Sequence, residues 1–135
     1  MIICILVLVA CNQDSWKEST LFESGSYTMI GEKDKIGFIY DDSEVTRFFP
    51  NKEQKYMWHL WGSEDLPGKP FKVIATSQKT DEEVSLVDSV VGGSNNGADA
   101  HIPSMMSQPH SGMWKLNAYV DDKLFGSVYV KVHSN

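Results

Sequence analysis

The stretch Trp114-Lys-Leu-Asn-Ala-Tyr-Val-Asp-Asp-Lys-Leu-Phe-Gly-Ser-Val-Tyr-Val-Lys-Val132 decides the predicted fold of this chain. Apolar and polar side chains alternate along both of its halves, and a turn predicted at Asp121-Asp122-Lys123 separates the halves. Since successive side chains of a strand point to opposite faces, this pattern predicts an antiparallel hairpin with one buried and one solvated face. We expect Gly126 to mark a bulge or a close approach of another backbone.

Short segments rich in β-branched and aromatic residues precede this hairpin, and turn residues separate them. Such residues suit a half-buried pleated surface, and no stretch holds an apolar period of 3.6 residues over three turns. We therefore predict strands at 26–30, 36–40, 55–61, 71–77, 84–91, 113–120 and 124–132. About seven strands at this spacing predict an all-β chain that folds as an immunoglobulin-like antiparallel β-sandwich. The segment Gly92–Asp99 is predicted as a flexible, turn-rich loop, and the residues from there to Gly112 hold at most one short strand.

Composition limits the classes of function that fit the chain. Apolar residues make up 41% of the sequence and charged residues 22%, which are values of a globular domain. The formal net charge is −6, and an acidic surface argues against nucleic acid, for which a basic footprint is expected. It argues equally against tight docking on anionic lipid headgroups.

The first eleven residues, Met1-Ile-Ile-Cys-Ile-Leu-Val-Leu-Val-Ala-Cys11, are similar to the signal of a bacterial lipoprotein. An apolar run of this length is shorter than the roughly 20 residues that span a bilayer, so it fits a signal segment better than a membrane helix. No basic residue precedes Cys11, and we expect the translation start to lie upstream. The alternative is an apolar strand or core segment at the N-terminus.

The signal predicts three regions: a lipoprotein signal segment at 1–10, the lipidated Cys11 with a polar tether at 11–25, and a β-sandwich domain at 26–135. Two acyl chains on Cys11 give stable anchoring, where one chain would be marginal. The expected location is therefore the extracytoplasmic face of the cell membrane. Because the only cysteines are Cys4 and Cys11, the domain has no internal disulfide and no thiol nucleophile.

A family resemblance covers about a quarter of the chain. It rests on Pro103-Ser104, on Gly112-Met-Trp-Lys-Leu116 and on Leu124-Phe-Gly126. These motifs resemble the C-terminal half of small uncharacterised lipoproteins of Gram-positive spore-formers, which have an immunoglobulin-like domain of unknown function. The resemblance implies a β-sandwich on the outer face of the cytoplasmic membrane, and it implies no catalytic residues.

An aromatic segment supplies the first candidate ligand-binding residues, Tyr56, Trp58 and Trp61. On a strand Tyr56 and Trp58 share one face, while Trp61 lies on the other. An exposed tryptophan there could stack on a sugar ring or anchor a protein partner. The alternative is that one tryptophan is the central core residue and a loop covers the other.

The remaining polar residues predict little chemistry. His101, His110 and Asp99 could meet across a loop, but the histidine spacing does not match a zinc motif. The serines lack a nucleophile-elbow context, and the acidic pairs fall at predicted turns. We therefore predict no metal site and no cofactor.

The sequence thus predicts a membrane-anchored, extracytoplasmic binding module that is not an enzyme. Its expected partners are the membrane, through the lipid on Cys11, and an envelope protein or a cell-wall glycan. One alternative is a metal-dependent or enzymatic module that uses His101, His110 and Asp99. Another is a regulatory lipoprotein that inhibits a neighbouring membrane protein.

Overall fold

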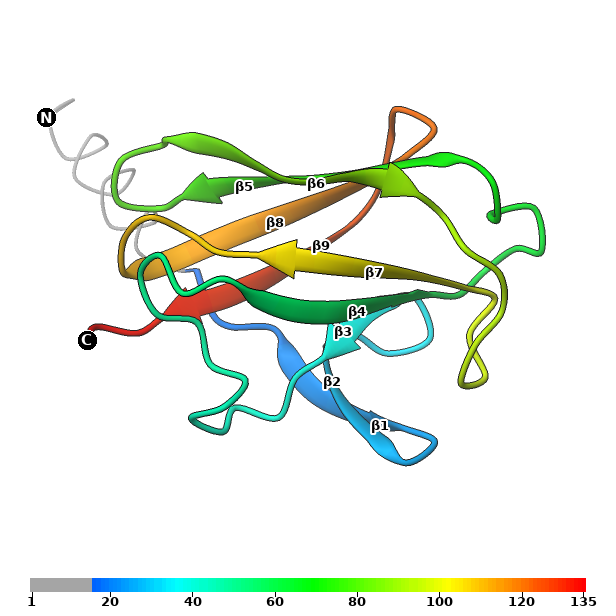
Figure 1. Cartoon of the computed structure of the whole chain (residues 1–135), viewed down its shortest axis with the longest axis horizontal. Coiled ribbons are helices and arrows are strands. Elements are labelled where there is room, and N and C mark those ends of the chain that lie inside the picture. The colour runs from blue at the N-terminus through cyan, green and yellow to red at the C-terminus, as the bar shows by residue number, and fades with distance from the viewer. Residues whose placement is uncertain (1–15) are drawn as a thin grey trace, which may run out of the picture.

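The computed structural model describes residues 16–135, and in this part of the chain it shows nine strands (Figure 1). They are β1 (Thr20–Ser24), β2 (Tyr27–Glu32), β3 (Ile36–Ile39), β4 (Gln54–Leu60), β5 (Pro70–Ser77), β6 (Glu83–Val90), β7 (Ala100–Met106), β8 (Gly112–Val120) and β9 (Lys123–Val132). Seven of them coincide with the predicted segments. The prediction of an all-β chain is confirmed, and β1 and β7 are additional strands.

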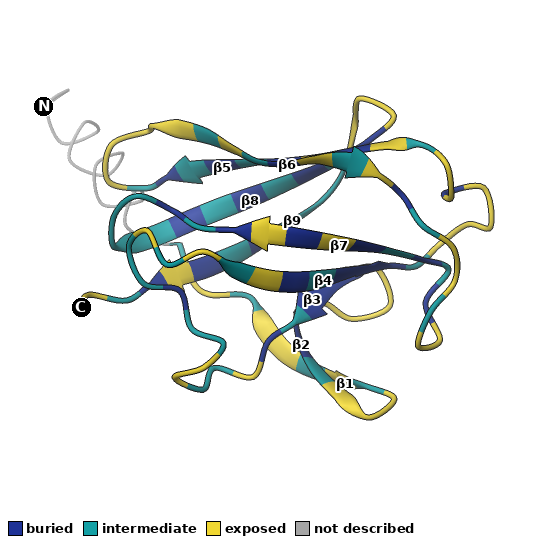
Figure 2. Cartoon of the chain, viewed as in Figure 1, coloured by how far each residue is buried: buried dark blue, intermediate teal, exposed yellow. Residues whose placement is uncertain are grey.

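The strands form two sheets, and every pairing within them is antiparallel. The five-stranded sheet has the order β1-β2-β3-β4-β7, and the four-stranded sheet has the order β6-β5-β8-β9. One apolar core cluster contains buried residues of both sheets, and Figure 2 shows buried positions along the strands of both sheets. The predicted sandwich is therefore confirmed.

Aromatic side chains join the two sheets at the centre of this core. The ring of Trp58 in β4 lies 4.8 Å from Phe38 of its own sheet and 5.7 Å from Phe71 of the opposite sheet. Trp58 and Trp114 are both fully buried. Trp58 of β4 and Trp114 of the predicted C-terminal hairpin thus belong to one core cluster.

The C-terminal hairpin has the predicted turn and the predicted irregularity. Asp121 and Asp122 form its two-residue loop with φ angles of 53° and 64°, which is the left-handed backbone that short hairpin loops favour. The register between β8 and β9 shifts beside Gly126. A Cβ atom at Gly126 would lie only 2.9 Å from the side chain of Ile36. The bulge expected at this glycine is therefore present, and the close neighbour is a side chain, not another backbone.

Strand β7 lies at an edge of the five-stranded sheet, next to β4. Its sequence contains Pro103, whose missing N–H group cannot join a ladder and confines proline to edge strands. The same proline weakened the sequence signal for a strand. In the structure the segment nevertheless has the alternation of a strand, because Ile102, Ser104 and Met106 are buried while the residues between them are exposed.

The segment predicted as a tether, residues 11–25, needs a correction. Residues Thr20–Ser24 form β1, which pairs with β2 through the two-residue loop at Gly25 and Ser26. Gly25 has a φ of 60°, as the first position of a tight hairpin loop can require. The predicted boundary between tether and domain was therefore wrong. The polar residues around this strand favoured a linker in the sequence, although the strand belongs to the sheet.

Residues 1–15 lie outside the described part of the chain, and with them lie the predicted signal segment 1–10 and Cys11. Among residues 16–135 the structure contains no helix with the length and apolar character needed to cross a membrane.

Candidate binding surface

The three predicted ligand-binding aromatics do not form one surface. Tyr56 and Trp58 are 2% and 0% exposed and face the core, so neither can stack on a ligand, and the prediction is wrong for these two residues. Trp61 is half-buried, and its indole Nε1 donates a hydrogen bond to the carbonyl of Gly97 at 3.2 Å. Trp58 is thus the central core residue, and a loop partly covers Trp61.

The structure does not bring the alternative metal or catalytic residues together. His101 belongs to β7, whereas His110 follows the far end of this strand, and seven extended residues span roughly 20 Å. Asp99 accepts a hydrogen bond from the Gly62 amide at 2.7 Å, and His110 pairs with Glu82 at 2.7 Å. Within residues 16–135 no three metal-ligating side chains cluster. The predicted convergence across a loop is therefore not found.

One histidine of β4 has a structural role. His59 is fully buried on the outer side of β4, where its Nε2 lies 3.1 Å from the Asn96 amide nitrogen and its Nδ1 lies 3.3 Å from the carbonyl of Met57. Burial lowers the pKa of His59, so the ring is neutral and can accept the Asn96 hydrogen bond. The hydrogen bond between Asn96 and His59 thus attaches the loop Gly92–Asp99, which was predicted to be flexible, to β4.

The outer face of the five-stranded sheet carries an apolar strip over its last strands. In β4 and β7, Met57 lies opposite Pro103 and Lys55 lies opposite Met105. Pro103 is exposed, and Met105 is 52% exposed. Methionine side chains adapt their shape to different apolar partners. The sequence did not reveal this strip, because its members are far apart along the chain.

A groove of about 310 Å³ opens beside this strip. Its walls come from the end of β3, the following turn and the start of β4: Ile39, Val45, Thr46, Gln54, Lys55, Tyr56 and Met57. Val45 projects at the edge of the groove and is 75% exposed. We define these seven residues, together with Pro103 and Met105, as the candidate binding surface.

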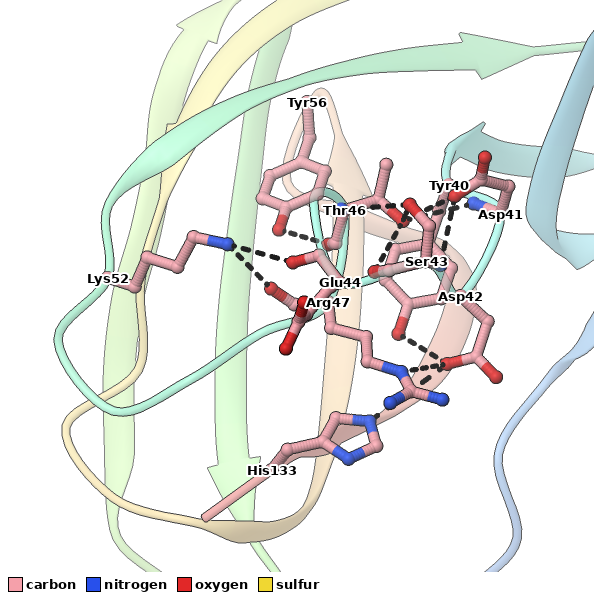
Figure 3. A network of polar contacts seen from close by, with 10 residues as sticks. All are labelled: Tyr40, Asp41, Asp42, Ser43, Glu44, Thr46, Arg47, Lys52, Tyr56 and His133. Carbon is pink, nitrogen blue, oxygen red and sulfur yellow. Dashed lines mark hydrogen bonds and ion pairs between the residues drawn. The ribbon is translucent and has the colours of Figure 1, made fainter. Parts of the chain in front are cut away.

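A hydrogen-bonded turn at residues 41–47 forms one wall of the groove (Figure 3). The carboxylate of Asp41 accepts hydrogen bonds from the Ser43 amide at 3.0 Å and from the Thr46 hydroxyl at 2.8 Å. These bonds favour the ionised carboxylate and lower the pKa of Asp41 to about 2. A short aspartate that binds the backbone two residues ahead is a common way to fix a turn.

Further contacts hold both ends of this turn. Arg47 donates a hydrogen bond to Asp42 at 3.0 Å, and the hydroxyl of Tyr40 lies 3.4 Å from the same carboxylate. The ammonium of Lys52 lies 3.3–3.4 Å from the carbonyls of residues 44, 45 and 47, and Figure 3 shows the contacts with Glu44 and Arg47. The bond to Arg47 lowers the pKa of Asp42, which keeps this carboxylate charged beside the arginine.

Tyr56 has a structural role in place of the predicted ligand contact. Its hydroxyl reaches out of the core and donates a hydrogen bond to the Thr46 carbonyl at 2.7 Å. Burial raises the pKa of Tyr56, so the phenol stays protonated and remains a donor. The turn that presents Val45 is thus tied to β4 from within the core.

This arrangement is suited to binding an apolar group. Ligand sites are commonly preformed, mainly apolar concavities with a few fixed polar groups at the rim. The turn is ordered by its own hydrogen bonds, so little conformational entropy is lost when a partner contacts Val45. The polar side chains around the groove are already engaged in holding the turn, as Asp41, Asp42 and Lys52 illustrate.

Comparison with known structures shows a common fold. The chain is similar to the crystal structure of a candidate lipoprotein from Bacillus anthracis, with 22% sequence identity and a TM-score of 0.68. The match covers 93% of this chain and 92% of the other. A search of curated proteins finds no match.

The family model described as Domain of unknown function (DUF4871) matches residues 7–130. This range includes all of the candidate binding surface and eight of the nine strands in full. The chain belongs to the DUF4871 family.

Proposed function

We propose that this protein is a lipid-anchored, extracytoplasmic β-sandwich that binds an envelope protein through the candidate binding surface and catalyses no reaction. The anchor is supported by the apolar run that ends in Ala10-Cys11 and by the fold likeness to a protein that is itself described as a candidate lipoprotein. Mass spectrometry of the membrane fraction tests the anchor. A diacylglyceryl group on Cys11 is the expected result, and a free thiol there would refute it.

The immunoglobulin-like character of the sandwich is part of this proposal. A buried tryptophan that packs against the opposite sheet is a feature of such domains, and Trp58 has this position. The sheets are antiparallel, and they contain five and four strands.

The observation that carries the binding role is the difference between the two outer faces of the sandwich. The four-stranded sheet presents a polar ladder, in which Ser127 donates a hydrogen bond to Asn117 and the ammonium of Lys115 lies over the ring of Tyr129. The five-stranded sheet presents the apolar groove with the exposed Val45 in its lining, and the exposed Met105 lies opposite the groove residue Lys55 in the sheet. Exposed apolar residues around a preformed concavity are typical of protein interaction sites.

A protein ligand fits this surface better than a cell-wall glycan. Sugar rings stack on exposed aromatic faces, but Tyr56 and Trp58 are buried and Trp61 is engaged by the loop at Gly97. An apolar concavity instead favours aliphatic or aromatic side chains of a polypeptide. The regulatory alternative, in which the partner is a membrane protein that this chain inhibits, uses the same surface.

Photocrosslinking in cells tests the binding role. A photoreactive side chain at Val45 should form one dominant protein adduct, whereas the same side chain at Val90 should not. Val90 is a matched control because it is also an exposed valine, at 60%, but lies in β6 of the other sheet. Equal adducts at both positions, or no adduct at Val45, would refute the proposed surface.

A further inference from the structure

The N-terminal end of the described chain is bound to β9. The Ser19 amide donates to the Tyr129 carbonyl at 2.9 Å, and the Tyr129 amide donates to the Ser19 hydroxyl at 2.8 Å. The ring of Trp16 packs edge-on against Tyr129 with 5.5 Å between the centroids. Residues 16–19 are therefore part of the folded body and do not belong to a free tether.

This attachment limits the distance between the proposed anchor and the domain. Only residues 12–15 separate Cys11 from Trp16. A fully extended chain spans at most about 3.6 Å per residue, so Trp16 lies within roughly 18 Å of the lipidated residue. The end of the sandwich that carries Trp16 is thus held close to the membrane if Cys11 is lipidated.

The turn at residues 41–47, which forms one wall of the groove, lies at the same end. Partial desolvation, and then the nearby charge of Asp42, raise the pKa of Glu18, while Arg47 acts on it in the opposite direction. His133, next to the C-terminus, lies 4.0 Å from Asp42. Figure 1 shows the start of the described chain, the C-terminus and the loop between β3 and β4 at one end of the sandwich.

We propose that the groove receives an apolar side chain from the membrane-proximal extracytoplasmic segment of an integral membrane protein. This inference rests on the proposed function, since it requires the anchor on Cys11. The short reach from Cys11 to Trp16 holds the groove close to the membrane, where such segments are located. The groove is concave, at about 310 Å³, and so fits a side chain rather than a flat lipid surface.

Charge also favours a protein over the bilayer as the occupant. The formal net charge is −6, and Glu44 and Glu53 are exposed next to the groove residues Val45 and Gln54. Carboxylates at this position oppose insertion among anionic headgroups. A polypeptide segment with an apolar side chain meets no such repulsion.

The test changes the height of the domain above the membrane. Three forms of the full chain carry a photoreactive side chain at Val45: the natural form, one with a rigid helical spacer between Ser15 and Trp16, and one with a Gly/Ser spacer of equal length. A helical spacer of about 20 residues adds roughly 30 Å. A flexible one allows the domain to return to the membrane at an effective concentration roughly tenfold lower. All three forms must be lipidated and fractionate with membranes.

The expected result is one protein adduct with the natural form, about tenfold less with the flexible spacer and none with the rigid spacer. The adduct partner should contain a membrane-spanning segment when identified by mass spectrometry. Undiminished adduct with the rigid spacer, a partner without such a segment, or an adduct to lipid alone would overturn this inference. The first two of these outcomes would leave the proposed binding function standing, whereas no adduct in the natural form would refute that function itself.

Discussion

The two sheets of this sandwich share one core but present different outer faces. On the four-stranded sheet, the ammonium of Lys115 lies over the ring of Tyr129, and Ser127 donates a hydrogen bond to Asn117 across the same pair of strands. On the five-stranded sheet, the outer side chains of β4 and β7 include Met57, Pro103 and Met105. The first face satisfies its own polar groups in water, as a solvated sheet must. The first face also exposes Val90 and Leu124, but the exposed apolar groups of the second lie beside a groove that a partner could fill, which is why we assign the interaction to it.

The comparison depends first on which side chains of β4 face inward, and this gives the largest expected effect. Replacing the buried Trp58 in W58A should lower the free energy of unfolding by about 3–5 kcal/mol, because a large cavity forms in the core. The half-buried Trp61 in W61A should cost only about 1 kcal/mol. Chemical denaturation of both variants measures the difference. Similar losses in the two variants would mean that the assignment of the faces is wrong.

A charge on each outer face tests whether the faces differ in binding. With a photoreactive side chain at Met105, V45E should reduce the protein adduct at least tenfold, because a carboxylate at the groove opposes desolvation by a partner. The matched variant V90E, on the other sheet, should leave the adduct unchanged. Both positions are exposed, so both variants should retain the stability of the natural chain. If V90E reduced the protein adduct as much as V45E, the two outer faces would not differ in binding.

The turn that forms one wall of the groove should become less ordered when a hydrogen bond from a core residue is removed. Y56F removes the hydrogen bond to the Thr46 carbonyl and should lower the free energy of unfolding by about 1 kcal/mol. It should also speed amide exchange of the turn residues. Y40F is the control, because the Tyr40 hydroxyl has only a long contact of 3.4 Å with Asp42. Exchange in Y56F as slow as in the natural chain would show that Tyr56 does not hold the turn.

The smallest effect concerns pH. The pKa of Asp41 is about 2 in the folded chain, against an ordinary value of 3.8. A lowered carboxyl pKa stabilises the turn above about pH 4, and this contribution is lost as the pH falls toward 2. The Ser43 amide resonance should therefore titrate with a midpoint near 2, and D41N should abolish this titration. A midpoint near 3.8 would show that the Asp41 bonds do not hold the turn in solution.

Much of the fold follows from local patterns in the sequence. The alternation through Trp114 and Val132 predicted β8 and β9, and Asp121-Asp122 predicted their turn, because strand period and short-loop geometry depend on neighbouring residues. The segment Tyr56–Trp61 predicted β4 but not its orientation. Both of its faces carry large apolar or aromatic groups, so alternation alone could not tell which face enters the core.

Most of the candidate binding surface could not be predicted from the sequence. Val45 and Met105 come from segments sixty residues apart in the chain. Only the pairing of β4 with β7 brings the segment of Met105 to the same face of the sheet as the groove. Tyr56 was predicted to contact a ligand, and its position under the turn depends on the path of the loop between β3 and β4. The burial of His59 likewise depends on Asn96, which arrives from the loop between β6 and β7.

The sequence by itself determined that this chain forms strands, where most of them lie and that its last hairpin buries one face. These properties arise from the two-residue period of side chains and from the backbone preferences of turn residues, which act over a few positions. The tertiary structure decided the order of the strands, which apolar groups remain in contact with water and which polar groups hold the groove. These outcomes depend on contacts between distant segments, and they are fixed only when the two sheets pack together.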